Sequence, residues 1–391
     1  MKIKVGVIFG GNSTEHEVSI ISATQAMQNI NTDKYDIYPI YIDKDGQWYS
    51  GKMLMDINVF KDFDSLKKYA NKIQITKRAG IVYLQRINFF KNLITDIDIF
   101  FPIVHGKNVE DGTIQGFLET IGAPYVGSGV LGSALGQDKV VMKQLFEQNN
   151  LPVVPYLWYY EEEYFENKED ILVDVKKLGF PLMIKPATLG SSIGISKVKK
   201  EEELDEAVSE AFKYDNKVVI EKEIENLMEI NCSVFGNYIN QETSSLEQVM
   251  GIDEFLSYRD KYMGGKKGST KGMVSTNRII PADISEKLKK EIEDYAVESF
   301  KVLNLSGVAR IDFLVDKKKK KVYINEPNTI PGSLSYYLWN DKGVKYRELI
   351  DDLLSLAIKD YRKKVSKVTS FDTNILSNQK GTKISKFNTE L

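Results

Sequence analysis

The stretch GVARIDFLVDKKKKKVYINEPNTIPG, residues 307–332, decides the fold of the C-terminal part of this chain. Two apolar segments joined by a lysine-rich turn predict a β-hairpin. Because strand side chains alternate between faces, Arg310 and Asp312 share one face, and Glu326 and Asn328 share another. If the strands pair, three oxygen ligands and a guanidinium converge, as in sites that hold Mg²⁺ against nucleotide phosphates. The alternative is an ordinary hairpin whose polar side chains face water.

The composition is that of a globular protein with two or three domains. The chain has 391 residues, of which 42% are hydrophobic and 28% charged. Its net charge of −2 gives no global field that favours nucleic acid or an anionic membrane. No apolar run approaches the roughly 20 residues of a membrane helix, and the N-terminus reads as a first strand instead of a signal peptide.

Cysteine and histidine are scarce, which limits the kinds of metal site. The single cysteine, Cys232, excludes a disulfide within the chain, is expected in the core and favours a cytoplasmic location. The two histidines, His16 and His105, are too few for thiolate and imidazole zinc sites. Any metal is therefore expected to have oxygen ligands.

The order of predicted elements indicates an α/β protein, α+β as a whole, with three domains. Residues 1–126 alternate strands and helices, as in a Rossmann-like domain with a parallel sheet. Residues 127–221 form the central domain, which begins with a helix predicted over Val130–Gln148. Residues 222–366 hold further strands, a polar loop, the hairpin and a closing helix, and 367–391 form a polar tail.

Two loops of the first domain are candidates for a ligand site. GGNSTEHEVS follows the first strand, and Thr14 with Glu17 predicts a capping box for a helix that starts at Thr14. Glu15 is then placed in the first helical turn, where the helix dipole also favours a carboxylate. FPIVHGKNVEDG places His105 at the C-terminal end of a buried strand, where open α/β sheets bind their ligands.

The loop in MIKPATLGSSIGISKV can bind an anion. Its glycines, with Ser191 and Ser192, let backbone N–H groups and hydroxyls approach a phosphate closely. The spacing fits neither a Walker A loop nor a dinucleotide fingerprint, which disfavours a Rossmann dehydrogenase. Lys185 on the preceding strand could place its ammonium on a phosphate oxygen. The alternative is a hairpin turn rich in glycine and serine.

The segment VVIEKEIENLMEI offers a possible purine site. A strand that ends in Glu221 and Lys222 and leads into a loop can present backbone amides to the edge of a base. Glu229, at the start of the next strand, could accept ribose hydroxyls. Acidic residues at strand ends are usually just solvated, so the signal is weak by itself.

The segment SYRDKYMGGKKGSTKG, residues 257–272, has many glycines and little apolar content. It carries Lys261 and Tyr262. A segment of this kind can be a lid that closes over substrate and excludes water. The alternative is a disordered surface loop.

These motifs, taken together, resemble those of the D-alanine–D-alanine ligase family of the ATP-grasp superfamily, over about residues 3–365. The matching motifs, in chain order, are GGNSTEHEVS, HGKNVEDG, QDK at 137–139, IKPATLGSSIG, EKEIENLMEI, DKY at 260–262, GVARIDF and NEPNTIPG. The resemblance implies an ATP-grasp architecture with ATP between the last two domains. It also implies a homodimer that acts on small amino-acid substrates.

The resemblance implies a role for individual residues. For ATP these are Lys139, Lys185, Ser191, Ser192, Glu221, Lys222, Ile224 and Glu229. For two Mg²⁺ ions, with Mn²⁺ as a substitute, they are Asp312, Glu326 and Asn328. The implied catalytic residues are Glu15, Ser191, Tyr262, Arg310 and Gly332. The implied substrate contacts are Glu15, His105, Lys261, Tyr337 and Leu338.

The expected reaction is the joining of two D-alanines through an acyl phosphate, for peptidoglycan precursor synthesis. Positioning and neutralisation of the transferring phosphoryl group would supply most of the catalysis. One departure from the family pattern is Tyr337, which stands where the family places a serine over the second substrate; Ser335 could replace that serine. The alternative to D-alanine keeps the same chemistry and changes the acceptor to D-serine, another amino acid, or an L-dipeptide. A non-catalytic nucleotide-binding regulator is disfavoured, because all the hairpin's polar residues are present.

Overall fold

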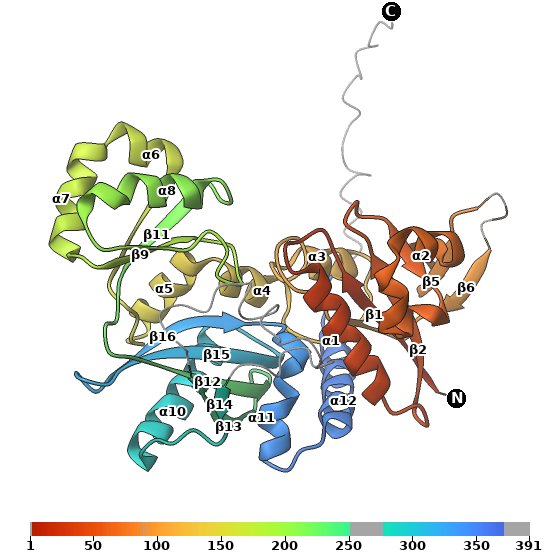
Figure 1. Cartoon of the computed structure of the whole chain (residues 1–391). Helices are drawn as coiled ribbons and strands as arrows, with labels where there is room; N and C mark the ends of the chain where they lie inside the picture. The colour runs from red at the N-terminus through yellow and green to blue at the C-terminus, as the bar shows by residue number, and fades with distance from the viewer. Residues whose placement is uncertain (1, 89, 91, 251–276, 371–391) are drawn as a thin grey trace, which may run out of the picture.

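A computed structural model describes residues 2–88, 90, 92–250 and 277–370 (Figure 1). The strands in these ranges form three sheets of seven, four and five strands. No helix in them combines the length and the apolar character that crossing a membrane requires. The predicted lid with Lys261 and Tyr262 lies outside the described residues.

The seven-stranded sheet lies in the N-terminal part of the chain. Its strands run in the order β6-β5-β4-β3-β2-β1-β7, and β1 pairs in parallel with β2 and β7, as the alternating pattern predicts. The remaining pairs are antiparallel and extend one edge. The strands are β1 (Ile3–Gly10), β2 (Tyr35–Ile42), β3 (Trp48–Ser50), β4 (Asn71–Arg78), β5 (Ile81–Arg86), β6 (Leu93–Asp96) and β7 (Ile99–Pro102). The helices are α1 (His16–Asn29), α2 (Phe63–Tyr69) and α3 (Thr113–Thr120).

The start of α1 differs from the prediction. The helix begins at His16 with Glu15 at the N-cap position, and the side chain of Glu15 makes no cap hydrogen bond. The capping box predicted for Thr14 and Glu17 is therefore wrong, and the Glu17 carboxylate instead pairs with Lys44 at 2.6 Å. Glu15 is consequently free of a capping role, although it is buried.

The four-stranded sheet is antiparallel and has one face covered by helices. Its order is β10-β9-β11-β8, and α6, α7 and α8 pack on one side of it (Figure 1). Leu182 and Ile184 point into this core, so Lys185, by strand alternation, points to the opposite face. The elements are β8 (Tyr156–Tyr160), α6 (Glu161–Glu166), α7 (Lys168–Leu178), β9 (Leu182–Pro186), β10 (Ser196–Val198), α8 (Leu204–Phe212) and β11 (Lys217–Lys222).

The five-stranded sheet has one apolar and one polar face. Its order is β14-β13-β12-β15-β16. On the apolar face, Cys232 and Ile311 pack with Phe300, which confirms the expected core position of the cysteine. The elements are β12 (Leu227–Gly236), β13 (Gln241–Met250), β14 (Asn277–Ile279), α10 (Glu286–Val302), β15 (Gly307–Asp316), β16 (Lys321–Asn328), α11 (Tyr336–Asp341) and α12 (Tyr346–Val365).

The single helix predicted over Val130–Gln148 is wrong, because it is two helices. They are α4 (Val130–Gln137) and α5 (Lys139–Gln148). Asp138 lies between them with extended backbone, and its carboxylate accepts hydrogen bonds from the amides of Val140 and Val141. A side chain that caps a new helix favours this break. Lys139 thereby becomes the first residue of α5.

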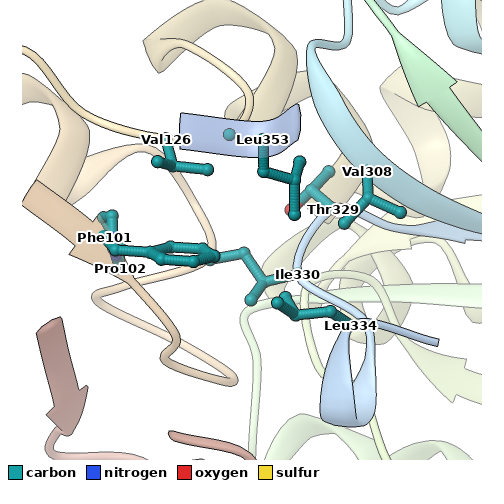
Figure 2. Close-up of a pocket in the computed structure, with 9 residues that line it drawn as sticks. Phe101, Pro102, Val126, Val308, Thr329, Ile330, Leu334 and Leu353 are labelled. Atoms are coloured by element: carbon teal, nitrogen blue, oxygen red, sulfur yellow. The ribbon is translucent and has the colours of Figure 1, made fainter. Parts of the chain in front are cut away.

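The contact between the seven-stranded and five-stranded sheets is apolar (Figure 2). Side chains from both sheets and from α12 line a cavity of about 10 Å³, which is close to the smallest space that holds one water. This cavity is too small for a substrate. Its lining includes Phe101, Val126, Val308, Ile330, Leu334 and Leu353.

Candidate active site

The hairpin predicted from residues 307–332 is present, and its polar side chains meet. Arg310 pairs with Asn328, and Asp312 with Glu326, in the antiparallel register of β15 and β16. The Asp312 carboxylate accepts from Arg310 Nε at 2.6 Å and Nη2 at 2.7 Å, and from Asn328 Nδ2 at 3.0 Å. Burial alone would lower the pKa of Arg310, but the Asp312 carboxylate raises it well above its usual range. The guanidinium is therefore fixed and charged.

Glu326 faces a lysine from another element. Lys139 Nζ lies 3.1 Å from the Glu326 carboxylate and also donates to the Leu189 carbonyl at 2.8 Å. The start of α5 is thus held between the hairpin and the glycine-rich loop. Lys139 was predicted to contact ATP phosphates, and the contact places it beside the predicted metal ligands.

The residues of the hairpin fit a divalent cation. Two carboxylates and an amide group stand on one polar face, and the cations Arg310 and Lys139 pair with the carboxylates. Within the described ranges no three His, Cys, Asp or Glu side chains are grouped to hold a metal. The predicted set contains two carboxylates, and its third member is the amide of Asn328. Such an oxygen-only set suits a hard cation.

A buried charge cluster surrounds Glu221 at the end of β11. The Glu221 carboxylate pairs with Lys185 at 2.5 Å and with Lys143 at 3.0 Å. Burial by itself would raise the pKa of Glu221, but the two ammonium groups lower it to about 2. Lys143 was not predicted as a site residue. Its spacing of four residues from Lys139 on one helix was the available signal.

In the segment predicted to hold adenine, some hydrogen-bond donors are already bonded to carbonyls of the same chain. The amides of Lys222 and Glu223 donate to the carbonyls of Pro155 and Pro181, at 3.0 and 3.1 Å. The Lys222 ammonium donates to the Gly179 and Phe180 carbonyls. A purine would thus depend on Ile224 and on backbone carbonyls. Glu229, the predicted ribose ligand, is exposed on β12.

The glycine-rich loop contacts the first helix. Ser191 and Ser192 adopt left-handed backbone conformations, with φ of 56° and 59°, in the sparsely populated region typical of functional loops. The Ser191 hydroxyl donates to the Glu15 carboxylate. A Cβ at Gly190 would meet Glu15 Oε2 at 3.4 Å, so the loop approaches Glu15 closely. Two predicted catalytic residues, far apart in sequence, are brought together.

His105 is buried at the end of β7 and has two partners within the chain. Its Nε2 lies 3.0 Å from the Ser22 hydroxyl, and its ring also bonds to the Ile330 backbone. Burial lowers its pKa to about 4, so the ring is neutral at physiological pH. The Ser22 hydroxyl also accepts from the amide of Ser333, which follows Gly332. His105 therefore supports the loop that carries Gly332.

Glu110 is a partly buried acid that was not predicted as a site residue, although it lies in the HGKNVEDG motif. Its carboxylate accepts from the amides of Ile330 at 3.0 Å and Gly106 at 3.1 Å. Burial, with the nearby charge of Glu15, raises its pKa to about 8. An acidic residue just beyond a buried strand was the signal for it.

Tyr337 and Leu338, the predicted substrate contacts, lie on α11. The Tyr337 hydroxyl donates to Glu247 Oε2 at 3.0 Å, and Leu338 is buried. Ser335, the suggested replacement for the family serine, is fully buried with a left-handed backbone. Glu247 was missed, because nothing in its own strand pattern indicates a partner so distant in sequence.

Comparison with known proteins identifies the family. Residues 4–128 match the model described as D-ala D-ala ligase N-terminus, and residues 145–355 match D-ala D-ala ligase C-terminus. The chain belongs to the D-alanine–D-alanine ligase family. It is 42% identical over 376 residues to the D-alanine--D-alanine ligase of Thermosipho melanesiensis, covering 96% of this chain and 98% of the relative. A second relative, from Natranaerobius thermophilus, is 39% identical over 95% of this chain and 99% of the relative.

Solved structures show the same fold. The D-alanine-D-alanine ligase from Coxiella burnetii superposes with a TM-score of 0.78 at 31% identity, covering 93% of this chain and 96% of that one. VanG D-Ala:D-Ser ligase from Enterococcus faecalis superposes with a TM-score of 0.76 at 31% identity, covering 91% of this chain and 100% of that one. This member of the family is thus a ligase with the ATP-grasp fold, as the motifs predict, and its family is ATP-dependent and generally uses a divalent metal.

Proposed function

We propose that this ligase joins two D-alanines into D-alanyl-D-alanine, a peptidoglycan precursor, by way of an acyl phosphate. The observation that carries the proposal is the bidentate contact of Arg310 with Asp312 on the polar face of the hairpin. It supports an anion-stabilising guanidinium beside a set of oxygen ligands. A carboxylate is a poor electrophile, and a site of this kind suits its activation by phosphoryl transfer.

In the first step, a carboxylate oxygen of the donor D-alanine attacks the γ-phosphorus of ATP, and ADP leaves. Lys139, Lys185 and the loop with Ser191 and Ser192 are the proposed phosphate contacts. A divalent cation, when bound, would neutralise charge on the transferring phosphoryl group. Asp312, Glu326 and Asn328 would hold it, and we propose two Mg²⁺ ions, with Mn²⁺ as a substitute.

In the second step, the amine of the acceptor attacks the acyl carbon, loses a proton, and displaces phosphate. The proposed oxyanion donors are Arg310 and the Gly332 backbone. One donor of this kind contributes about 3–4 kcal/mol to the barrier reduction. Glu110, His105 and the apolar contact between the sheets support the position of the loop that carries Gly332.

The donor site is proposed around Glu15. Its carboxylate accepts from Ser191, which supports a role for the pair in holding the donor's ammonium group while the loop covers the phosphates. Lys261 and Tyr262, in the proposed lid, would complete the site. The relatives at 39–42% identity favour D-alanine over D-serine as acceptor.

We also propose the organisation of the chain. The proposed domains are 1–126, 127–221 and 222–366, with a polar tail at 367–391. Met142 and Phe146 of α5 pack in the core of the five-stranded sheet, so this helix would connect the second and third domains. A homodimer and a cytoplasmic location complete the proposal.

The test is phosphate release by the purified protein with Mg-ATP and D-alanine, with the product identified by mass. D-Serine, D-lactate and L-alanine are supplied as acceptors in parallel reactions. Release with D-alanine alone, together with the dipeptide mass, is the expected result. Release only with a different acceptor would contradict the proposed product while leaving the phosphoryl-transfer step in place.

A further inference from the structure

A row of polar side chains crosses the five-stranded sheet and extends beyond the proposed metal ligands. In the antiparallel registers Glu326 pairs with Asp312, Asp312 with Asn231, and Asn231 with Glu247. Directly paired residues share a face of the sheet, so all four lie on the polar face with Arg310. The row therefore leads from the phosphate end of the site to β13. The function proposed above assigns no role to its far end.

Glu247 at that far end is a buried carboxylate with three partners. It accepts from Asn231 Nδ2 at 3.0 Å and from the Tyr337 hydroxyl at 3.0 Å. Its other oxygen lies 2.9 Å from Arg278 Nη1, and its side chain is only 3% exposed. Because both oxygens are engaged, Glu247 is suited to hold neighbouring groups instead of binding a substrate itself.

Arg278 is more exposed than Glu247. It lies on β14, where it pairs with Val249, two residues from Glu247, and therefore shares the polar face. Its guanidinium carbon is 4.6 Å from the centre of the Tyr337 ring, and its side chain is 21% exposed. A guanidinium has five N–H donors in a fixed fork, and Nη1 is the nitrogen that faces Glu247. Such a fork, held in plane by an aromatic ring, matches a carboxylate.

Tyr337 connects this cluster to the reaction centre. It lies on α11, which packs beside β13 (Figure 1), and it follows Gly332 closely in the chain. One side of Tyr337 contacts Arg278 and Glu247, and the charge of Arg310 also acts on its hydroxyl. An α-amino acid has one carbon between its amine and its carboxylate. A group that binds the acceptor's carboxylate must therefore stand next to the carbon that its amine attacks.

We propose that Arg278 binds the α-carboxylate of the acceptor amino acid, with Glu247 and Tyr337 as the residues that position its guanidinium. This inference rests on the proposed ligase function and names a residue for its acceptor site. Tyr337, in place of a serine, then acts as the surface on which Arg278 stacks. The acceptor must carry a free carboxylate, whereas the donor site does not involve Arg278.

The experiment separates the acceptor step from donor activation. Hydroxylamine traps the activated donor as a hydroxamate, which measures the first step without an amino-acid acceptor. D-Alanine and D-alaninamide are then compared as acceptors, because the amide lacks the carboxylate. The variants are Arg278→Gln, Arg278→Lys and Tyr337→Phe, and Arg347→Gln, an exposed arginine on α12, is the matched control.

In Arg278→Gln we expect hydroxamate formation at the wild-type level and a rise in the acceptor KM on the order of 10- to 100-fold. The preference for the acid over the amide should disappear. Arg278→Lys should recover part of this preference for the acid, because the positive charge remains while the forked guanidinium geometry is lost. Tyr337→Phe should raise the acceptor KM less, since the ring is retained, and Arg347→Gln should behave as wild type.

An unchanged acceptor KM and acid preference in Arg278→Gln, with normal hydroxamate formation, would overturn this proposal alone. If Arg278→Gln does not fold, the acid and the amide are compared as acceptors in Arg278→Lys instead. An unchanged preference for the acid in Arg278→Lys would also overturn this proposal. Absence of hydroxamate from the wild-type protein with every amino acid tried would instead overturn the ligase function on which the proposal rests.

Discussion

The hydroxyl of Ser191 donates a hydrogen bond to the carboxylate of Glu15, across 176 residues of sequence. This contact joins the glycine-rich loop of the four-stranded sheet to the start of α1 on the seven-stranded sheet. The contact holds the loop against the first domain.

Replacing Ser191 with alanine should lower kcat/KM with little effect on stability. The lost hydrogen bond is to a charged group, which corresponds to roughly 10- to 100-fold in rate if it is made in the transition state. Ser209→Ala, at an exposed position on α8, is the control. Steady-state kinetics and thermal unfolding of both variants provide the measurement. An unchanged kcat/KM in Ser191→Ala would show that the contact only orders the resting loop.

Substituting either hairpin carboxylate, Asp312 or Glu326, should abolish activity. The two substitutions should differ in their effect on stability. Asp312→Asn leaves the buried Arg310 without its counter-charge, so we expect a loss of about 3–5 kcal/mol in unfolding free energy as well as loss of turnover. Glu326→Gln should also abolish turnover, but its partner Lys139 retains the Leu189 carbonyl, so the fold should be nearly unaffected. Urea unfolding and phosphate release test this. Near-normal activity in Glu326→Gln would contradict the assignment of the hairpin as the metal site.

Glu221→Gln should destabilise the protein by about 3–5 kcal/mol, because the buried Lys143 and Lys185 lose their shared counter-charge. The KM for ATP should also rise, since Lys185 is no longer held in place. Glu202→Gln, on the surface beside Lys200, should change stability by less than about 0.5 kcal/mol. Equal effects of the two substitutions on urea unfolding would contradict the importance assigned to the buried cluster.

His105 and Glu110 should give opposite dependences of stability on pH. The pKa of His105 is lowered to about 4, so between about pH 6.5 and pH 4 the unfolded chain binds more protons and stability falls on acidification. The pKa of Glu110 is raised to about 8, so its contribution is present at low pH and is lost as pH rises from about 4.5 to 8. The two contributions oppose one another near pH 5–6.

Single variants should therefore reveal each contribution. Glu110→Gln should lose on the order of 2 kcal/mol of stability between about pH 7.5 and pH 5, because the His105 contribution is then unopposed. His105→Asn should instead gain stability over the same change of pH, relative to wild type. Urea midpoints at both pH values test this. Parallel pH profiles for the three proteins would show that neither group is perturbed as described.

Sequence predicted the local features well, because strand alternation and turns depend on neighbouring residues. The hairpin, with Arg310 and Asp312 on one strand and Glu326 on the other, follows from the period of two and the lysine-rich turn. The order of the motifs likewise predicted the family. The start of α1 and the break at Asp138 were missed, since each depends on competition between local hydrogen bonds.

The tertiary structure alone decided which distant groups share an environment. Glu110 and His105 have shifted pKa values because elements far apart in sequence bury them, and burial has no signature at a single position. The cluster of Glu247, Arg278 and Tyr337 depends on the register between β13 and β14 and on the packing of α11. Sequence therefore determined the chemistry that each segment offers, and strand register with burial determined which of those groups act together.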